Sequence, residues 1–62
     1  MFDKAALDKL FDDLRGKYGE QSDWEDILRQ AHLGVAYSDA NVPLASKNID
    51  PRVASAIEQH KP

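Results

Sequence analysis

The stretch Gln21–Leu33, QSDWEDILRQAHL, carries the clearest helix signal in this chain of 62 residues. Ser22 followed three residues later by Glu25 has the spacing of a capping box, in which the two side chains bond to free backbone N–H groups at a helix start. Apolar residues then recur at steps of three and four, at Trp24, Ile27, Leu28 and Ala31. The stretch therefore predicts an amphipathic helix that packs its apolar face against the rest of the chain.

This central helix is expected over residues 23–35. Its first turn is acidic, which suits the positive end of the helix dipole. Gly34 is the expected stop, although the apolar pattern would let the helix reach Tyr37. His32 then lies near the helix C-terminus, where the dipole favours a positively charged imidazole.

A second helix is expected upstream, over residues 4–18. Asp3 is its predicted N-cap, and Phe2 is placed to pack against Leu7 one turn into the helix. Its apolar residues fall on an arc about 100° wide, as a helix facing a core requires; they are Leu7, Leu10, Phe11, Leu14 and Tyr18. Gly19 follows as the residue expected to take the left-handed conformation beyond the helix end.

The C-terminal part begins with an irregular crossover over residues 38–48. Within it, the segment around Pro43 has the composition of a single helical turn, capped by Asn41 and closed by Asn48. Asp50 as N-cap and a proline at the first helical position then predict a short helix over residues 51–59.

These elements together predict one all-α domain: an antiparallel helical hairpin with a short C-terminal helix packed across it. The hairpin follows because the first two helices are separated by only a few residues. The last helix is too short to be stable alone in water, so it has to pack on the other two. His60 is expected in a frayed tail after it.

Composition and charge disfavour several classes of function. Eight basic and eleven acidic residues give a net charge of −3, which disfavours binding to nucleic acids or anionic membranes. The chain has no cysteine, no apolar run of membrane-spanning length and no signal-peptide pattern, so a cytoplasmic location is expected.

The sequence shows no constellation that indicates an enzyme. It has neither cysteine nor threonine, and its most notable serine, Ser22, is assigned to helix capping. His32 and His60 stand 28 positions apart and match no zinc spacing, and no phosphate-binding glycine loop is present. We therefore expect no catalytic residues, cofactor, metal or small-molecule substrate.

Protein binding remains as the predicted function, with the chain as a regulator, inhibitor or accessory subunit of a larger assembly. Trp24 is the leading candidate contact, because tryptophan and tyrosine are enriched in binding hot spots; Tyr18, Tyr37, Asp23 and Asp26 complete the predicted surface. The structural alternative is that Trp24 simply closes the end of the core. A homodimer is equally compatible, since pairing would bury apolar surface that a small monomer leaves exposed.

A helix-turn-helix DNA-binding regulator is the alternative function, because the chain has three short helices. Two features weigh against it. About ten residues separate the second and third helices, where the motif has three or four, and the third helix and its tail offer only Arg52, His60 and Lys61 to phosphates.

Overall fold

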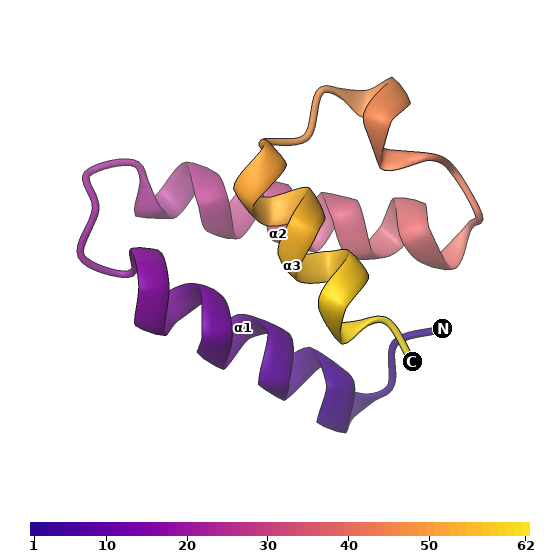
Figure 1. Cartoon of the computed structure of the whole chain (residues 1–62), viewed down its shortest axis with the longest axis horizontal. Helices are drawn as coiled ribbons and strands as arrows, with labels where there is room; N and C mark the ends of the chain where they lie inside the picture. The colour runs from indigo at the N-terminus through magenta and orange to yellow at the C-terminus, as the bar shows by residue number, and fades with distance from the viewer.

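The computed structural model describes residues 1–62 and contains three α-helices and one 3-10 helix, with no strand (Figure 1). The elements in chain order are α1 (Lys4–Tyr18), α2 (Trp24–Asp39), the 3-10 helix η1 (Leu44–Lys47) and α3 (Pro51–His60). The predicted all-α fold class is confirmed.

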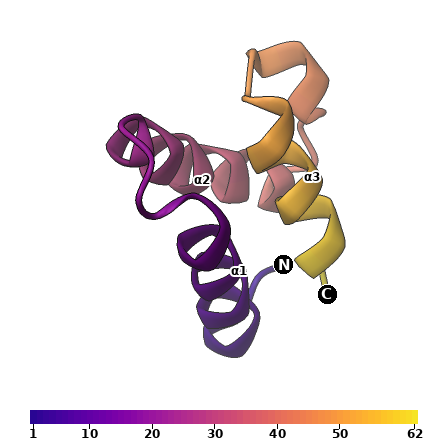
Figure 2. The same ribbon diagram turned by 60° about the vertical axis from the view of Figure 1, so that its left-hand side comes forward.

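The third helix lies across the other two. α1 and α2 are antiparallel: the loop joins them at one end, and they diverge away from it. α3 lies across both helices, on one side of the pair (Figures 1 and 2). It contacts each of them more extensively than they contact one another. The short C-terminal helix therefore holds the pair together.

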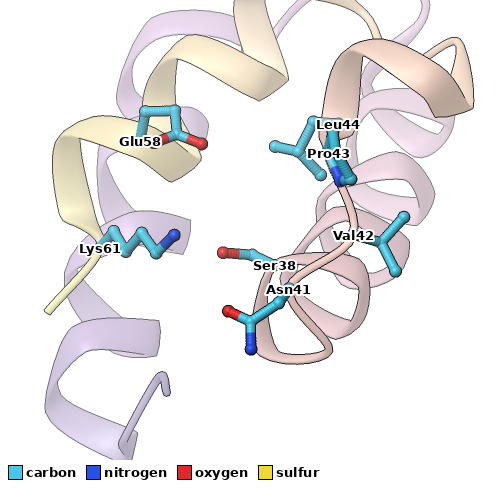
Figure 3. A pocket seen from close by; sticks show the side chains of 7 residues that line it. All are labelled: Ser38, Asn41, Val42, Pro43, Leu44, Glu58 and Lys61. Atoms are coloured by element: carbon cyan, nitrogen blue, oxygen red, sulfur yellow. The ribbon is translucent and has the colours of Figure 1, made fainter.

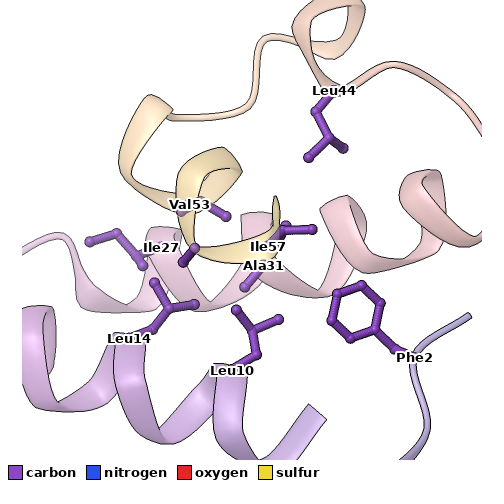
Figure 4. Packing of buried hydrophobic residues seen from close by; sticks show 9 residues of the cluster. Phe2, Leu10, Leu14, Ile27, Ala31, Leu44, Val53 and Ile57 are labelled. Carbon is purple, nitrogen blue, oxygen red and sulfur yellow. The ribbon is translucent and has the colours of Figure 1, made fainter. Parts of the chain in front are cut away.

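The core lies where the three helices meet (Figure 4). Each helix contributes fully buried aliphatic side chains, and burial of each one stabilises the fold by about 1.5–3 kcal/mol; these are Leu10, Leu14, Ile27, Val53 and Ile57. Phe2 and Leu44 close the core at its edges and are each 7% exposed. The segment before α1 is held in place by a hydrogen bond from the Phe2 N–H to Asp39 Oδ1, at 2.9 Å.

Two predicted helix starts are confirmed. Asp3 Oδ1 accepts a hydrogen bond from the Ala6 N–H at 2.8 Å, which caps α1. Asp50 Oδ1 accepts from the Arg52 N–H at 2.8 Å, and Pro51 is the first residue of α3.

The predicted capping box at the start of α2 is wrong. The N-cap residue is Asp23, and no side-chain hydrogen bond caps this end. The chain makes one more turn before the helix begins, with the Trp24 N–H bonded to the Gln21 carbonyl at 3.1 Å. That turn moves Ser22 out of the N-cap position, so it cannot pair with Glu25 in the way the spacing suggested.

Gly34 does not end α2, and the expected boundary at residue 35 is one turn too early. The helix continues to Asp39, and Gly34 is buried where α3 crosses it. A Cβ atom at this position would overlap Cδ1 of Ile57. The missing side chain of Gly34 therefore lets α3 lie close to α2. A prediction that takes glycine as a sign of a helix end does not foresee this role.

The left-handed positions are asparagines, not the expected glycine. Gly19 has φ −62°, a right-handed conformation, and its N–H bonds to the Arg15 carbonyl at 2.9 Å. Asn41 and Asn48 have φ 60° and 54°, which asparagine tolerates better than most residues. Asn48 closes η1 as predicted, whereas Pro43, and not Asn41, stands at its N-terminal end.

The chain end is not frayed at His60, contrary to expectation. His60 is the last residue of α3, and its Nε2 lies 3.1 Å from Oδ2 of Asp13 in α1. Both side chains are 26% exposed. This contact attaches the C-terminal end of α3 to α1, because α3 places the His60 imidazole next to the Asp13 carboxylate.

The close approach at Gly34 generates a stability prediction. Gly34→Ala should lower the free energy of unfolding, because overpacking against Ile57 costs about 1–3 kcal/mol and exceeds the gain in helix propensity. Gly16→Ala is the matched control, since a Cβ atom there meets no atom within 4 Å, and it should stabilise by about 0.5–1 kcal/mol. Urea denaturation followed by circular dichroism measures both.

A double variant tests whether the loss of stability in Gly34→Ala comes from the contact with Ile57. Ile57→Val removes the Cδ1 methyl group that the new Cβ would meet, so Gly34→Ala should cost less in the Ile57→Val background than in the wild type. Strict additivity of the two substitutions would contradict the proposed contact.

Candidate functional site

A groove runs between α1 and α2 on the side of the pair that faces away from α3. Its volume is about 390 Å³, and every residue that lines it belongs to α1, α2 or the start of the loop between them. The lining combines apolar side chains with charged and polar ones at the rim: Phe11, Asp12, Arg15, Gly19, Trp24, Leu28 and His32.

Helix geometry explains why these side chains share one groove. Trp24, Leu28 and His32 follow one another at intervals of four residues and so form one row along α2. Phe11 and Arg15 form the matching row on α1. Each row lies beside the buried positions of its helix, such as Leu10 or Ile27, because consecutive helical residues are turned by about 100°.

The apolar members of the groove are only partly covered. Phe11 and Trp24 pack against the core with one side and remain half-exposed on the other, and Leu28 is also half-exposed. The face away from α3 therefore presents apolar side chains to its surroundings.

His32 forms part of the groove wall. Its ring centroid lies 4.7 Å from that of Phe11, with a tilt of 33°, an ordinary aromatic contact. Because α2 extends to Asp39, His32 stands in the middle of the helix, and the expected explanation by the helix dipole is wrong.

The five predicted partner-binding residues do not gather in one site, although Tyr18 and Asp23 both contact Arg52. Trp24 alone lines the groove. Tyr18 lies beneath the Arg52 guanidinium, with 5.2 Å between the guanidinium carbon and the ring centroid. Tyr37 lies near the other end of α2, where Lys47 Nζ is 5.3 Å from its ring.

The two acidic candidates are engaged within the chain. Asp23 Oδ2 accepts a hydrogen bond from Arg52 Nη2 at 2.7 Å. Asp26 accepts from Arg29 and from Gln30 on its own helix, and the Arg29 bond is the main reason that the pKa of Asp26 is lowered. Gln30 in turn accepts from the Asp50 N–H at 2.6 Å, so this side of α2 supports the start of α3.

Arg52 is the residue that the sequence pattern did not single out. Its guanidinium donates to Asp50, Asp23 and Gln21 at distances of 2.7–3.2 Å. These bonds raise the pKa of Arg52, chiefly through Asp50, and the same pairing lowers the pKa of Asp50. Arg52 thus ties the start of α3 to the loop between α1 and α2.

Two further hollows are smaller. One lies between the C-terminal ends of α2 and α3 and has a volume of about 170 Å³; Figure 3 shows Ser38, Asn41, Glu58 and Lys61 around it. The other lies beside α3, with a volume of about 330 Å³, and is lined by Lys17, Tyr18, Pro51, Arg52, Ser55, Ala56 and Gln59. The α1–α2 groove is the largest of the three.

No three His, Cys, Asp or Glu side chains gather where they could hold a metal ion. None of the helices combines the length and the apolar character needed to cross a bilayer. Comparison with protein-family models, with curated proteins and with solved structures finds no match to this chain.

Three carboxyl groups that accept hydrogen bonds from basic side chains should make the stability of the fold depend on pH. The pKa values of Asp13, Asp26 and Asp50 are lowered from the ordinary value of 3.8, so the folded state binds fewer protons than the unfolded state below that value. Their stabilisation is complete above about pH 5 and is lost as the pH falls through the lowered pKa values. The urea midpoint should therefore drop steadily between about pH 4 and pH 2.

Asp50→Asn isolates one of these groups. Asparagine also caps helices well, so the variant keeps the cap and loses only the charge that faces Arg52. It should be less stable than the wild type at pH 6, with a difference that shrinks toward pH 2. A difference that stays constant over the whole range would contradict the ion-pair explanation.

Proposed function

We propose that this chain is a cytoplasmic, non-enzymatic protein-interaction module that binds its partner through the α1–α2 groove. In that role it acts as a regulator, inhibitor or accessory subunit of a larger assembly. The observation that carries the proposal is the row of half-exposed apolar side chains, Phe11, Trp24 and Leu28, on the face that no other part of the chain covers.

The chemistry of the groove supports this role. Tryptophan and arginine are the residue types most enriched in binding hot spots, and Trp24 and Arg15 both line it. Its lining combines apolar residues with charged ones, as protein interfaces do. A groove between two helices also suits an amphipathic helix as its occupant.

The predicted binding surface changes accordingly. Trp24 keeps its place as the central contact, whereas Asp23 and Asp26 already have partners within the chain. Phe11, Leu28 and Arg15 replace them as the proposed contacts.

The DNA-binding alternative has less support. The guanidinium of Arg52, the main basic group of α3, is engaged by Asp23 and Asp50 and is not free to meet phosphate. The segment between α2 and α3 contains η1 and is much longer than the turn of a helix-turn-helix.

Capture of partners from the native cell lysate tests the proposal. Leu28→Lys places a charge in the groove without shortening the side chain and should reduce recovery of partners at least about tenfold, as loss of a hot-spot contact does. Ser55→Lys is the matched control, because it adds the same charge to an exposed position on α3 and should leave recovery unchanged.

Both variants first need a native circular dichroism spectrum and a cooperative thermal transition, so that loss of binding is not confused with loss of the fold. Equal recovery by folded Leu28→Lys and the wild type would refute the groove as the binding site.

A further inference from the structure

We propose that the occupant of the α1–α2 groove is a second copy of this chain, so that two copies pair face to face through α1 and α2. The proposal rests on the proposed function, because it names the partner of the same groove. It is carried by the size of the face, the position of its apolar residues and the arrangement of its charges.

Two helices with half-exposed apolar rows can complete one another in a dimer. The residues in question lie on α1 and α2 beside the core positions and line the groove; they are Phe11, Trp24 and Leu28. Two such faces in contact make an arrangement of four helices, whose centre is built from the same kinds of side chain as a four-helix bundle. Both copies then cover side chains that the monomer leaves half-exposed.

The face is large enough for a stable dimer. The molecule is a slab of 30 × 26 × 15 Å, and α1 and α2 form its broad side opposite α3 (Figures 1 and 2). A standard protein interface buries about 800 Å² on each partner. That area is about a fifth of the 4158 Å² accessible surface of this chain, so an interface of standard size has to extend beyond the groove over the broad side.

The charges at the groove rim are self-complementary. Asp12 and Arg15 both line the groove, carry opposite charges and form no ion pair within the chain. In a two-fold interface, a contact from residue i to residue j is always accompanied by the contact from j to i. A two-fold axis perpendicular to α1, midway between residues 12 and 15, therefore brings Arg15 of each copy against Asp12 of the other, which gives two ion pairs from one arrangement.

This pattern favours a second copy over an unrelated helix. Two nearby acidic side chains are already paired within their own helices, Asp13 with Lys17 and Asp26 with Arg29. Asp12 and Arg15, the two oppositely charged groove residues without an ion pair, can each pair with the other residue of a second copy across a two-fold axis.

Sedimentation velocity between about 2 and 200 µM tests the dimer, because self-association follows protein concentration. The wild type should shift from monomer toward dimer over this range, and so should Ser55→Lys. Leu28→Lys should remain monomeric at the highest concentration. A wild type that stays monomeric at about 200 µM would overturn the proposal.

Charge reversal tests the two-fold arrangement. Asp12→Arg and Arg15→Asp each place like charges against one another twice in the dimer, so each should weaken dimerisation about five- to tenfold. The double variant exchanges the two charges and should restore the wild-type dissociation constant. Single variants that dimerise like the wild type, or a double variant no better than the singles, would refute the arrangement.

The outcomes separate this proposal from the proposed function. If the wild type is monomeric but lysate capture depends on Leu28, the groove binds a different protein and only the dimer is refuted. If the wild type is monomeric and capture is independent of Leu28, both are refuted.

Discussion

Ile57 of α3 lies against the backbone of α2 at Gly34, where no side chain keeps the two helices apart. This close approach lets a helix of ten residues reach the core of the longer pair and contribute Val53 and Ile57 to it. A helix of that length has little stability of its own and depends on such packing. Its two ends are then fixed by polar contacts, with Arg52 at the start and His60 at the finish.

The position of α3 also decides which side of the molecule is left open. Because α3 covers one side of the α1–α2 pair, the apolar rows on the other side have nothing from the same chain to pack against. The ion pairs follow the same division: Arg52 joins elements on the covered side, whereas Asp12 and Arg15 stay unpaired at the open groove. The surface available to a partner is therefore a consequence of how the core is completed.

Much of the fold could be predicted from the sequence, because local patterns determine local structure. Asp3 and Asp50 mark helix starts through bonds to residues two or three positions away, and the spacing of apolar residues gives the three helices. Some of the errors arise where a distant residue intervenes. Gly34 resembles a helix end until Ile57 is placed against it, and Asp23 is occupied by Arg52, which lies 29 positions away.

The candidate site was predictable only in part, for the same reason. Trp24 stands out by residue type, but the apolar pattern assigns its neighbours Phe11 and Leu28 to the core. Only the packing of α3 divides one broad apolar face into a buried row and a half-exposed row. No spacing within a single helix carries that distinction.

The contact between His60 and Asp13 spans 47 positions and joins the last residue of α3 to the middle of α1. With the core shared among all three helices, no helix can detach without exposing the buried side chains of the other two. We therefore expect the three helices to unfold together as one cooperative unit. Amide protons in the middle of α1, α2 and α3 should accordingly exchange through the same global opening, so any ligand that binds only the folded state would also raise the protection of α3.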